Sequence, residues 1–342
     1  MTTYWFPKAK LAQFIGERGG RSIYLPIGPE ALGRLRPEKA GAAVEALAGA
    51  RTGQSPKSLF FPTAESVGHY GPAAGAATAV EAPPVTLVGL RACELRALAY
   101  LDQVLLEGDF QDPTYAARRD ALTVVSVDCA DCRETCFCTL VGGAPYAAEG
   151  YDVNLTPIEG GFVADVATEK GRAWVEGLAE ASAEQLAARD ALREAMTERV
   201  RAQNAEFSPV AAESPPDLPN DDAEAWQAYA ADCVECAACT NGCPTCHCFY
   251  LYDQAVGPED FERVRTWDSC LLGSYHRMAG TGANVKPTPR PRLRSRLANR
   301  VLHKFSYSPQ QYGLLGCVGC GRCIEGCLGA IDIRKAVQEL SQ

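Results

Sequence analysis

Cys233-Val234-Glu235-Cys236-Ala237-Ala238-Cys239-Thr240-Asn241-Gly242-Cys243-Pro244 is the stretch that decides the C-terminal fold. Three cysteines are separated by two residues each, and a fourth follows after a gap of three. This spacing is typical of a loop that ligates one 4Fe-4S cluster with three thiolates and sends its fourth cysteine to a second cluster. A second copy of the motif runs from Cys317 to Cys327, with Leu328 in the proline position.

The two copies of the motif predict a crossed set of ligands. Cluster 1 takes Cys233, Cys236, Cys239 and Cys327, and cluster 2 takes Cys317, Cys320, Cys323 and Cys243. Zinc also favours four thiolates, but its structural sites generally use separated CxxC pairs. The continuous run of cysteines therefore favours iron and sulfur, and the duplicated motif predicts a two-cluster, ferredoxin-like region.

Eight of the 16 cysteines lie outside these motifs. Cys93, Cys129, Cys136 and Cys138 follow predicted strands of an α/β region, where ligand sites commonly form at the edge of the sheet. A third 4Fe-4S cluster on these four cysteines is one hypothesis; buried structural thiols or a zinc site are the alternatives, and spacing alone leaves them open.

The remaining cysteines have no ligand spacing of their own. Cys246, Cys248 and Cys270 lie in the cluster region, where they either pack or bind a metal with His247, and packing is the favoured interpretation. Cys132 is interpreted as an extra thiol. No catalytic residue is assigned, because the chain has no dinucleotide-binding, P-loop or zinc-protease motif.

The composition excludes several classes of function. A net charge of -9 argues against nucleic acid as the main partner. No apolar run approaches the roughly 18 residues of a membrane span. The N-terminus lacks the features of an export signal, so a cytoplasmic location is expected. The one basic stretch, residues 286–304, predicts a docking face for an acidic partner or a set of internal ion pairs.

Three regions follow from the pattern along the chain. Residues 1–165 predict an α/β domain, residues 166–224 a helical connector with a Pro-rich acidic linker, and residues 225–342 a mostly helical two-cluster domain. The extended segments expected in the first region are Ser22–Ile27, Ser58–Phe61, Val85–Leu90 and Leu122–Val127, and a helix is expected over Ala92–Leu106.

Several short blocks in this order resemble one protein family. They are Ser55-Pro56-Lys57, Phe60-Phe61-Pro62, Gly89-Leu90-Arg91-Ala92-Cys93-Glu94-Leu95, Cys129 with Cys136-Phe137-Cys138, Gly150-Tyr151-Asp152, Cys243-Pro244-Thr245-Cys246-His247-Cys248-Phe249, Trp267-Asp268-Ser269-Cys270 and His303-Lys304-Phe305. The family comprises the 4Fe-4S dicluster electron-transfer subunits of anaerobic sulfite reductases and the beta subunits of cytoplasmic NiFe sulfhydrogenases, and the blocks span nearly the whole chain. Glu94, where the family usually has aspartate, is a departure that removes no ligand.

The resemblance implies an iron-sulfur electron-transfer subunit of a multi-subunit oxidoreductase. Its partners would be a flavin and 2Fe-2S subunit that handles NAD(P)H and a catalytic subunit containing sirohaem or NiFe. The resemblance also favours the third cluster, because all four of its cysteines fall in family blocks. Two alternatives remain: a cluster-bearing reductase that itself acts on a sulfur or disulfide substrate, and a zinc-stabilised interaction module.

Overall fold

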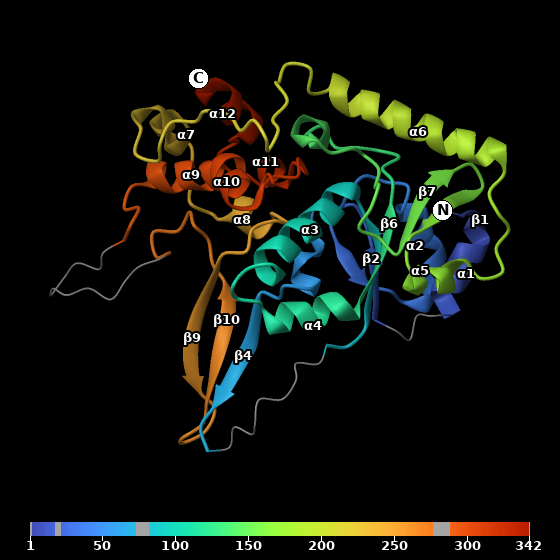
Figure 1. Cartoon of the computed structure of the whole chain (residues 1–342), viewed down its shortest axis with the longest axis horizontal. Coiled ribbons are helices and arrows are strands. Elements are labelled where there is room, and N and C mark those ends of the chain that lie inside the picture. The colour runs from blue at the N-terminus through green and yellow to red at the C-terminus, as the bar shows by residue number, and fades with distance from the viewer. Residues whose placement is uncertain (1, 18–21, 73–81, 276–287, 342) are drawn as a thin grey trace. The chain divides into compact units, whose positions relative to one another are not determined.

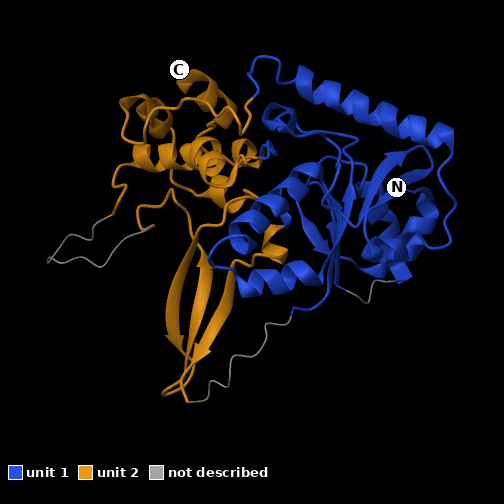
Figure 2. Ribbon diagram, viewed as in Figure 1, with its two compact units in different colours: residues 1–56, 82–209, 318–321 blue, residues 57–81, 210–317, 322–342 orange. Residues whose placement is uncertain are grey.

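The structure is a computed structural model that describes all residues except 1, 18–21, 73–81, 276–287 and 342 (Figure 1). It divides into two compact units (Figure 2). Unit 1 comprises Met1–Pro56, Ala82–Pro209 and Val318–Gly321, and unit 2 comprises Lys57–Glu81, Val210–Cys317 and Arg322–Gln342.

Unit 1 is built on a seven-stranded mixed sheet with the strand order β1-β8-β7-β6-β5-β2-β3. The strands are β1 (Thr3–Pro7), β2 (Ser22–Pro26), β3 (Leu32–Arg34), β5 (Val85–Leu90), β6 (Leu122–Val127), β7 (Val153–Ile158) and β8 (Gly161–Val166). The central strands β2, β5, β6 and β7 pair in parallel, and the outer pairings are antiparallel. Parallel strands buried on both faces require nearly continuous apolar sequence, which β5 and β6 have.

Helices of unit 1 pack against this sheet. They are α1 (Lys8–Glu17), α2 (Ala40–Ala46), α3 (Ala92–Leu106), α4 (Pro113–Ala121), α5 (Glu169–Val175) and α6 (Ala183–Ala202). Leu11 of α1, Val44 of α2 and Trp174 of α5 join the strands in one buried core. Short 3-10 turns of unit 1 lie at Pro37–Lys39 and Cys138–Val141, and another 3-10 turn, Pro56–Leu59, begins at Pro56 of unit 1 and continues with residues of unit 2.

Helix α6 is fixed to the sheet by buried ion pairs. Arg193 donates from Nε to Asp128 at 2.7 Å and from Nη2 to Asp165 at 3.1 Å. Arg189 also pairs with Asp165, at 3.0 Å. The sequence predicted a helical connector here, but these contacts place α6 in unit 1. The change of unit falls between Pro209 and Val210, inside the predicted linker.

Unit 2 combines short helices with a three-stranded antiparallel sheet. The helices are a 3-10 turn at Glu224–Trp226, α7 (Gln227–Ala231), α8 (Ala238–Asn241), α9 (Leu293–Leu302), α10 (Ser308–Tyr312), α11 (Arg322–Glu325) and α12 (Ile333–Leu340), with a π-helical turn at His303–Tyr307. The strands, in the order β4-β10-β9, are β4 (Ala64–Tyr70), β9 (Phe249–Ala255) and β10 (Phe261–Trp267). Their arrows are visible in Figure 1.

The structure differs from the sequence prediction in two elements. The predicted helical character of residues 225–342 did not include the β9–β10 hairpin, whose first strand is exposed at every position and so lacks a burial pattern. Ser58–Phe61, predicted as extended, is not a strand: Ser58 and Leu59 end the 3-10 turn Pro56–Leu59, and the amides of Phe60 and Phe61 donate to the Lys57 carbonyl. No helix among the described residues is both long and apolar enough to span a bilayer.

Candidate iron-sulfur centres

The backbones of the two cysteine loops have the same handedness at corresponding positions. In the first loop, Glu235 and Ala237 have positive φ angles of 54° and 59°. In the second loop the corresponding residues are Gly319 and Gly321, with φ angles of 67° and 75°. A left-handed conformation costs roughly 1–2 kcal/mol for a residue with a Cβ, but little for glycine. Both loops therefore make the compact turn that closely spaced thiolate ligands require.

One cavity in unit 2 brings the predicted ligands of cluster 1 together. Its lining includes Cys233, Cys236, Cys239 and Cys327, and Cys323 also contributes. Burial raises the pKa of Cys239, and the neighbouring thiols of Cys233 and Cys327 raise it further. The structure thus gathers three thiols of the first loop and the last cysteine of the second motif around one space.

A buried guanidinium group faces this cavity. Arg300 of α9 lines the cavity and is 5% exposed. Its Nη2 donates to the Cys239 carbonyl at 3.3 Å, while its Nε has no hydrogen-bond partner among the described residues. Burying a cation is unfavourable unless an anion accompanies it, and a cluster held by four thiolates supplies negative charge. The donor set and the cation together fit a 4Fe-4S cluster.

Cys327 reaches the first loop through a close approach of two backbone segments. A Cβ added to Gly329 would lie 1.9 Å from the Asp232 carbonyl oxygen, so the packing requires glycine. The Ile331 amide donates to Cys327 Sγ at 3.3 Å. Hydrogen bonds to ligand sulfur are one of the means by which a protein sets a cluster potential.

A buried lysine lies beside predicted ligands of cluster 2. Lys304, on the π-helical turn, donates from Nζ to Thr245 Oγ1 and to a backbone carbonyl, both at 2.9 Å. Thr245 Oγ1 lies 3.1 Å from Cys243 Sγ. Burial opposes the charged form of Lys304, but the Cys243, Cys246 and Cys317 thiols outweigh burial and raise its pKa. This lysine is therefore placed to stabilise thiolates and a bound anion.

Cys320 belongs to unit 1, whereas the other predicted ligands of cluster 2 belong to unit 2. Arg51 donates from Nε to the Cys320 carbonyl. Cys320 packs with Ala97 of α3 and with Val318, and Cys93 lies against the same group. The four ligands of cluster 2 therefore remain a prediction from the spacing of the two motifs.

The N-terminal cysteines follow the carboxyl ends of neighbouring strands. Because β5 and β6 pair in parallel, Cys93 at the start of α3 and Cys129 after β6 leave the sheet at the same edge. Cys136 and Cys138 lie close enough to Cys129 to influence its pKa, which burial raises above its usual value. The structure therefore gathers Cys129, Cys136 and Cys138, and it places Cys93 against Cys320.

Two arginines accompany these thiols. Arg91 is almost fully buried, and its Nε has no hydrogen-bond partner in the described part of the chain. Arg96 leaves Nη1 buried and likewise without a described partner. Burial raises the pKa of Cys138 to about 12, whereas Arg96 favours its thiolate, as Arg91 does for Cys129. The thiol set and these guanidinium groups fit an anionic cluster.

Residues at the end of α6 hold the loop that carries Cys136. Gln203 Nε2 and Asn204 Nδ2 both donate to the Cys136 carbonyl, at 2.6 and 2.9 Å. Cys132 Sγ donates to Gln203 Oε1 at 3.4 Å. The segment interpreted from sequence as a connector therefore positions a candidate ligand loop.

Sequence reasoning predicted the thiols and included Arg300 and Lys304 in the basic stretch, with a docking face or internal ion pairs as its interpretations, but it gave no role to Lys57. Lys57, Lys304 and Arg300 are separated by long stretches of chain from most of the cysteines that they approach. Lys57 and Lys304 fall in the family blocks Ser55-Pro56-Lys57 and His303-Lys304-Phe305, which was the available signal. Within the described residues, no three His, Cys, Asp or Glu side chains converge as ligands of a single metal ion.

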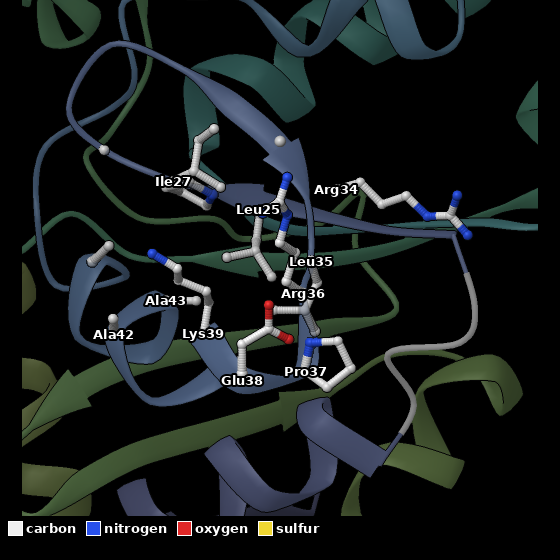
Figure 3. Close-up of a pocket in the computed structure, with 14 residues that line it drawn as sticks. Leu25, Ile27, Arg34, Leu35, Arg36, Pro37, Glu38, Lys39, Ala42 and Ala43 are labelled. Carbon is white, nitrogen blue, oxygen red and sulfur yellow. The ribbon is translucent and has the colours of Figure 1, made fainter.

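A separate cavity of about 1010 Å³ opens in unit 1 beside β2, β3 and α2 (Figure 3). Leu25, Ile27 and Leu35 give it an apolar lining, and Arg36 and Lys39 add positive charge. None of its lining residues is a cysteine. The candidate cluster chemistry therefore lies elsewhere.

An α/β unit and a cysteine-rich unit with two copies of one ligand-loop motif are the features of an iron-sulfur protein. Residues 232–331 match the family described as a 4Fe-4S dicluster domain. The chain belongs to the NiFe sulfhydrogenase beta-subunit family: it is 30% identical over 260 residues to Sulfhydrogenase 2 subunit beta of Pyrococcus furiosus, and the match covers 75% of this chain and 74% of that relative. No solved structure matches the chain. The chain is thus an iron-sulfur subunit of the hydrogenase-related oxidoreductases.

Proposed function

We propose that the chain relays single electrons between two partner subunits. One partner is a flavin and 2Fe-2S subunit that handles NAD(P)H, and the other is a catalytic metal subunit of the NiFe hydrogenase or sirohaem sulfite reductase type. The observation that carries the proposal is the cavity where cysteines of both motifs meet beside the buried Arg300. Family membership supports the subunit role.

The proposed ligands follow the two motifs and the N-terminal set. Cluster 1 uses Cys233, Cys236, Cys239 and Cys327; cluster 2 uses Cys317, Cys320, Cys323 and Cys243; and a third cluster uses Cys93, Cys129, Cys136 and Cys138. Bound 4Fe-4S clusters supply one-electron redox chemistry with potentials set by charge, burial and hydrogen bonds to sulfur. The chain contributes thiolate ligands, amide donors and buried cations that stabilise the reduced, more negative state.

The outer side of the first loop offers a place for a partner. Cys236 is exposed. Val234 lies two residues before it and is 60% exposed, and Leu328, which follows the proposed ligand Cys327, is 78% exposed. Isolated exposed apolar residues are common, but here they flank two predicted ligands of one cluster. We propose that electrons enter or leave the chain beside cluster 1.

The relay is tested on the chain purified without oxygen, alone and with its co-purifying subunits. In the complex, NAD(P)H should bleach the iron-sulfur absorbance and produce EPR signals of reduced 4Fe-4S clusters. The isolated chain should be reduced by dithionite but not by NAD(P)H, since it has no dinucleotide motif. A colourless, zinc-containing chain, or steady turnover of sulfur or disulfide substrates by the isolated chain with a dye donor, would contradict the relay.

The third cluster is tested by a matched pair of cysteine variants. Cys129→Ala removes a proposed ligand, whereas Cys132→Ala removes a neighbouring thiol outside the ligand set. The first variant should lose about four irons and four acid-labile sulfides per chain, and the second should keep the wild-type content. Equal iron content in the two variants would contradict a cluster at this site.

A further inference from the structure

Three cysteines of unit 2 are not used by either duplicated motif: Cys246, Cys248 and Cys270. Cys246 and Cys248 lie just before β9, and Cys270 lies just after β10. These two strands are paired along their whole length, and the Asp268 amide donates to the Cys248 carbonyl at 3.0 Å. The base of the hairpin therefore brings together cysteines that are more than 20 residues apart in sequence.

The three side chains form one group of thiols. Cys248 and Cys270 share a side-chain hydrogen bond, and the Tyr275 hydroxyl donates to Cys248. Cys246 shares a side-chain hydrogen bond with Cys243, a proposed ligand of cluster 2, and also lies within electrostatic range of Cys248. A disulfide or a simple dithiol uses two cysteines, so three adjacent thiols exceed what that chemistry requires.

Two buried ammonium groups lie next to this group. Lys57 is 2% exposed, and its Nζ donates to the Cys246 carbonyl at 2.9 Å and sits 3.9 Å from the centre of the Trp267 ring. Burial lowers the pKa of Lys57, and among the thiols that oppose this effect Cys246 acts most strongly. Lys304 also approaches Cys246, although it faces Cys243 of cluster 2 first. Lys57 is therefore the cation most specific to the three-thiol group.

The spacing of the first two cysteines repeats a pattern seen elsewhere in the chain. Cys246-His247-Cys248 has the same C-x-C form as Cys136-Phe137-Cys138. Each pair approaches a further cysteine: Cys248 approaches Cys270, which is distant in sequence, and the second pair approaches Cys129, which precedes it in the same loop region. In both places, positively charged side chains lie beside the thiols. The same combination of thiols and cations thus occurs at two positions outside the ferredoxin-type motifs.

We propose that Cys246, Cys248 and Cys270 ligate an additional iron-sulfur cluster, with Lys57 stabilising its negative charge. Three thiolates leave one iron of a cubane for a ligand other than cysteine. The site shares no ligand with clusters 1 and 2, so its presence does not depend on the relay proposed above. It replaces the sequence-based interpretation that these three cysteines only pack.

The test compares two variants of the full chain, both purified without oxygen. The triple variant Cys246→Ala, Cys248→Ala, Cys270→Ala should contain three to four fewer irons per chain than the control Cys132→Ala, while the EPR signals of clusters 1 and 2 persist. Unchanged iron and labile sulfide in the triple variant would overturn the additional cluster. Absence of the signals of clusters 1 and 2 from the wild-type chain would instead contradict the relay.

A second variant covers the case in which the triple variant does not fold. Lys57→Met keeps all cysteines and removes one positive charge beside Cys246. In an EPR-monitored redox titration, the signal of the additional cluster is the one that belongs neither to clusters 1 and 2 nor to the cluster lost in Cys129→Ala. This signal should move to a more negative potential in Lys57→Met. If the wild-type chain shows no such signal, or if the signal does not move in Lys57→Met, the proposal is wrong.

Discussion

Replacing Lys304 by methionine should make the potential of cluster 2 more negative. The Lys304 ammonium is buried and lies close to Cys243, a proposed ligand. Contacts of 2.9 and 3.1 Å through Thr245 Oγ1 join its Nζ to Cys243 Sγ, so these two atoms are at most 6.0 Å apart. A positive charge at that distance favours the reduced state, because reduction adds an electron.

The size of the shift follows from Coulomb's law. With an effective dielectric constant of about 20, a unit charge about 6 Å away contributes roughly 3 kcal/mol. For a one-electron couple this corresponds to about 120 mV. Because the added electron spreads beyond one sulfur atom, we expect a shift of roughly 50 to 120 mV toward negative potential.

The assay is an EPR-monitored redox titration of the chain purified without oxygen, with iron content measured in parallel. Lys304→Arg retains the charge and should shift the potential much less. Lys335→Met removes a charge from an exposed position on α12 and controls for the change in net charge. A Lys304→Met protein with full iron content and a shift no larger than that of Lys335→Met would refute the electrostatic role.

Two further substitutions test the packing of unit 1 by urea unfolding of the anaerobic protein. Gly321→Ala would place a Cβ 2.2 Å from the Thr135 carbonyl oxygen at φ 75° and should lower the free energy of unfolding by roughly 2–5 kcal/mol. The control Gly177→Ala, at φ 71° in open space, should lower it by only about 1–2 kcal/mol. Equal losses of stability in the two variants would contradict the close approach at Gly321. Arg193→Met leaves the buried Asp128 carboxylate without its arginine partner, while Arg189 still pairs with Asp165, and should lose about 3–5 kcal/mol. Arg172→Met breaks an exposed pair and should lose under about 1 kcal/mol; a similarly small loss for Arg193→Met would show that its network is not needed.

The local sequence pattern was sufficient to predict the bounds of the central strands and of one helix in unit 1. The structure has β5, β6 and α3 at the bounds expected from the sequence, Val85–Leu90, Leu122–Val127 and Ala92–Leu106. Strands buried on both faces must be continuously apolar, and an amphipathic helix must repeat apolar residues every three or four positions. In these segments, local preference and tertiary environment agree.

The local sequence pattern did not predict the secondary structure correctly where buried and exposed residues do not alternate as they do in a half-buried strand. Every residue of β9 is exposed, so its sequence shows no alternation that would identify a strand. Ser58–Phe61 contains apolar residues that are buried in a turn, and apolar content alone cannot distinguish a turn from a strand. Strand pairing depends on partners that are distant in sequence, as the pairing of β4 with β10 illustrates.

The sequence by itself determined the thiols, because cysteine spacing within a short loop restricts which metal centre the loop can surround. It also placed Cys93 and Cys129 after strands that could share an edge. Only the tertiary structure decided which cations accompany those thiols. Lys57, Lys304 and Arg300 approach cysteines through the folding of distant segments, and a charge acts through space rather than along the chain. The tertiary structure likewise joined Cys248 to Cys270, since hydrogen bonding between β9 and β10 brings the two ends of that segment together.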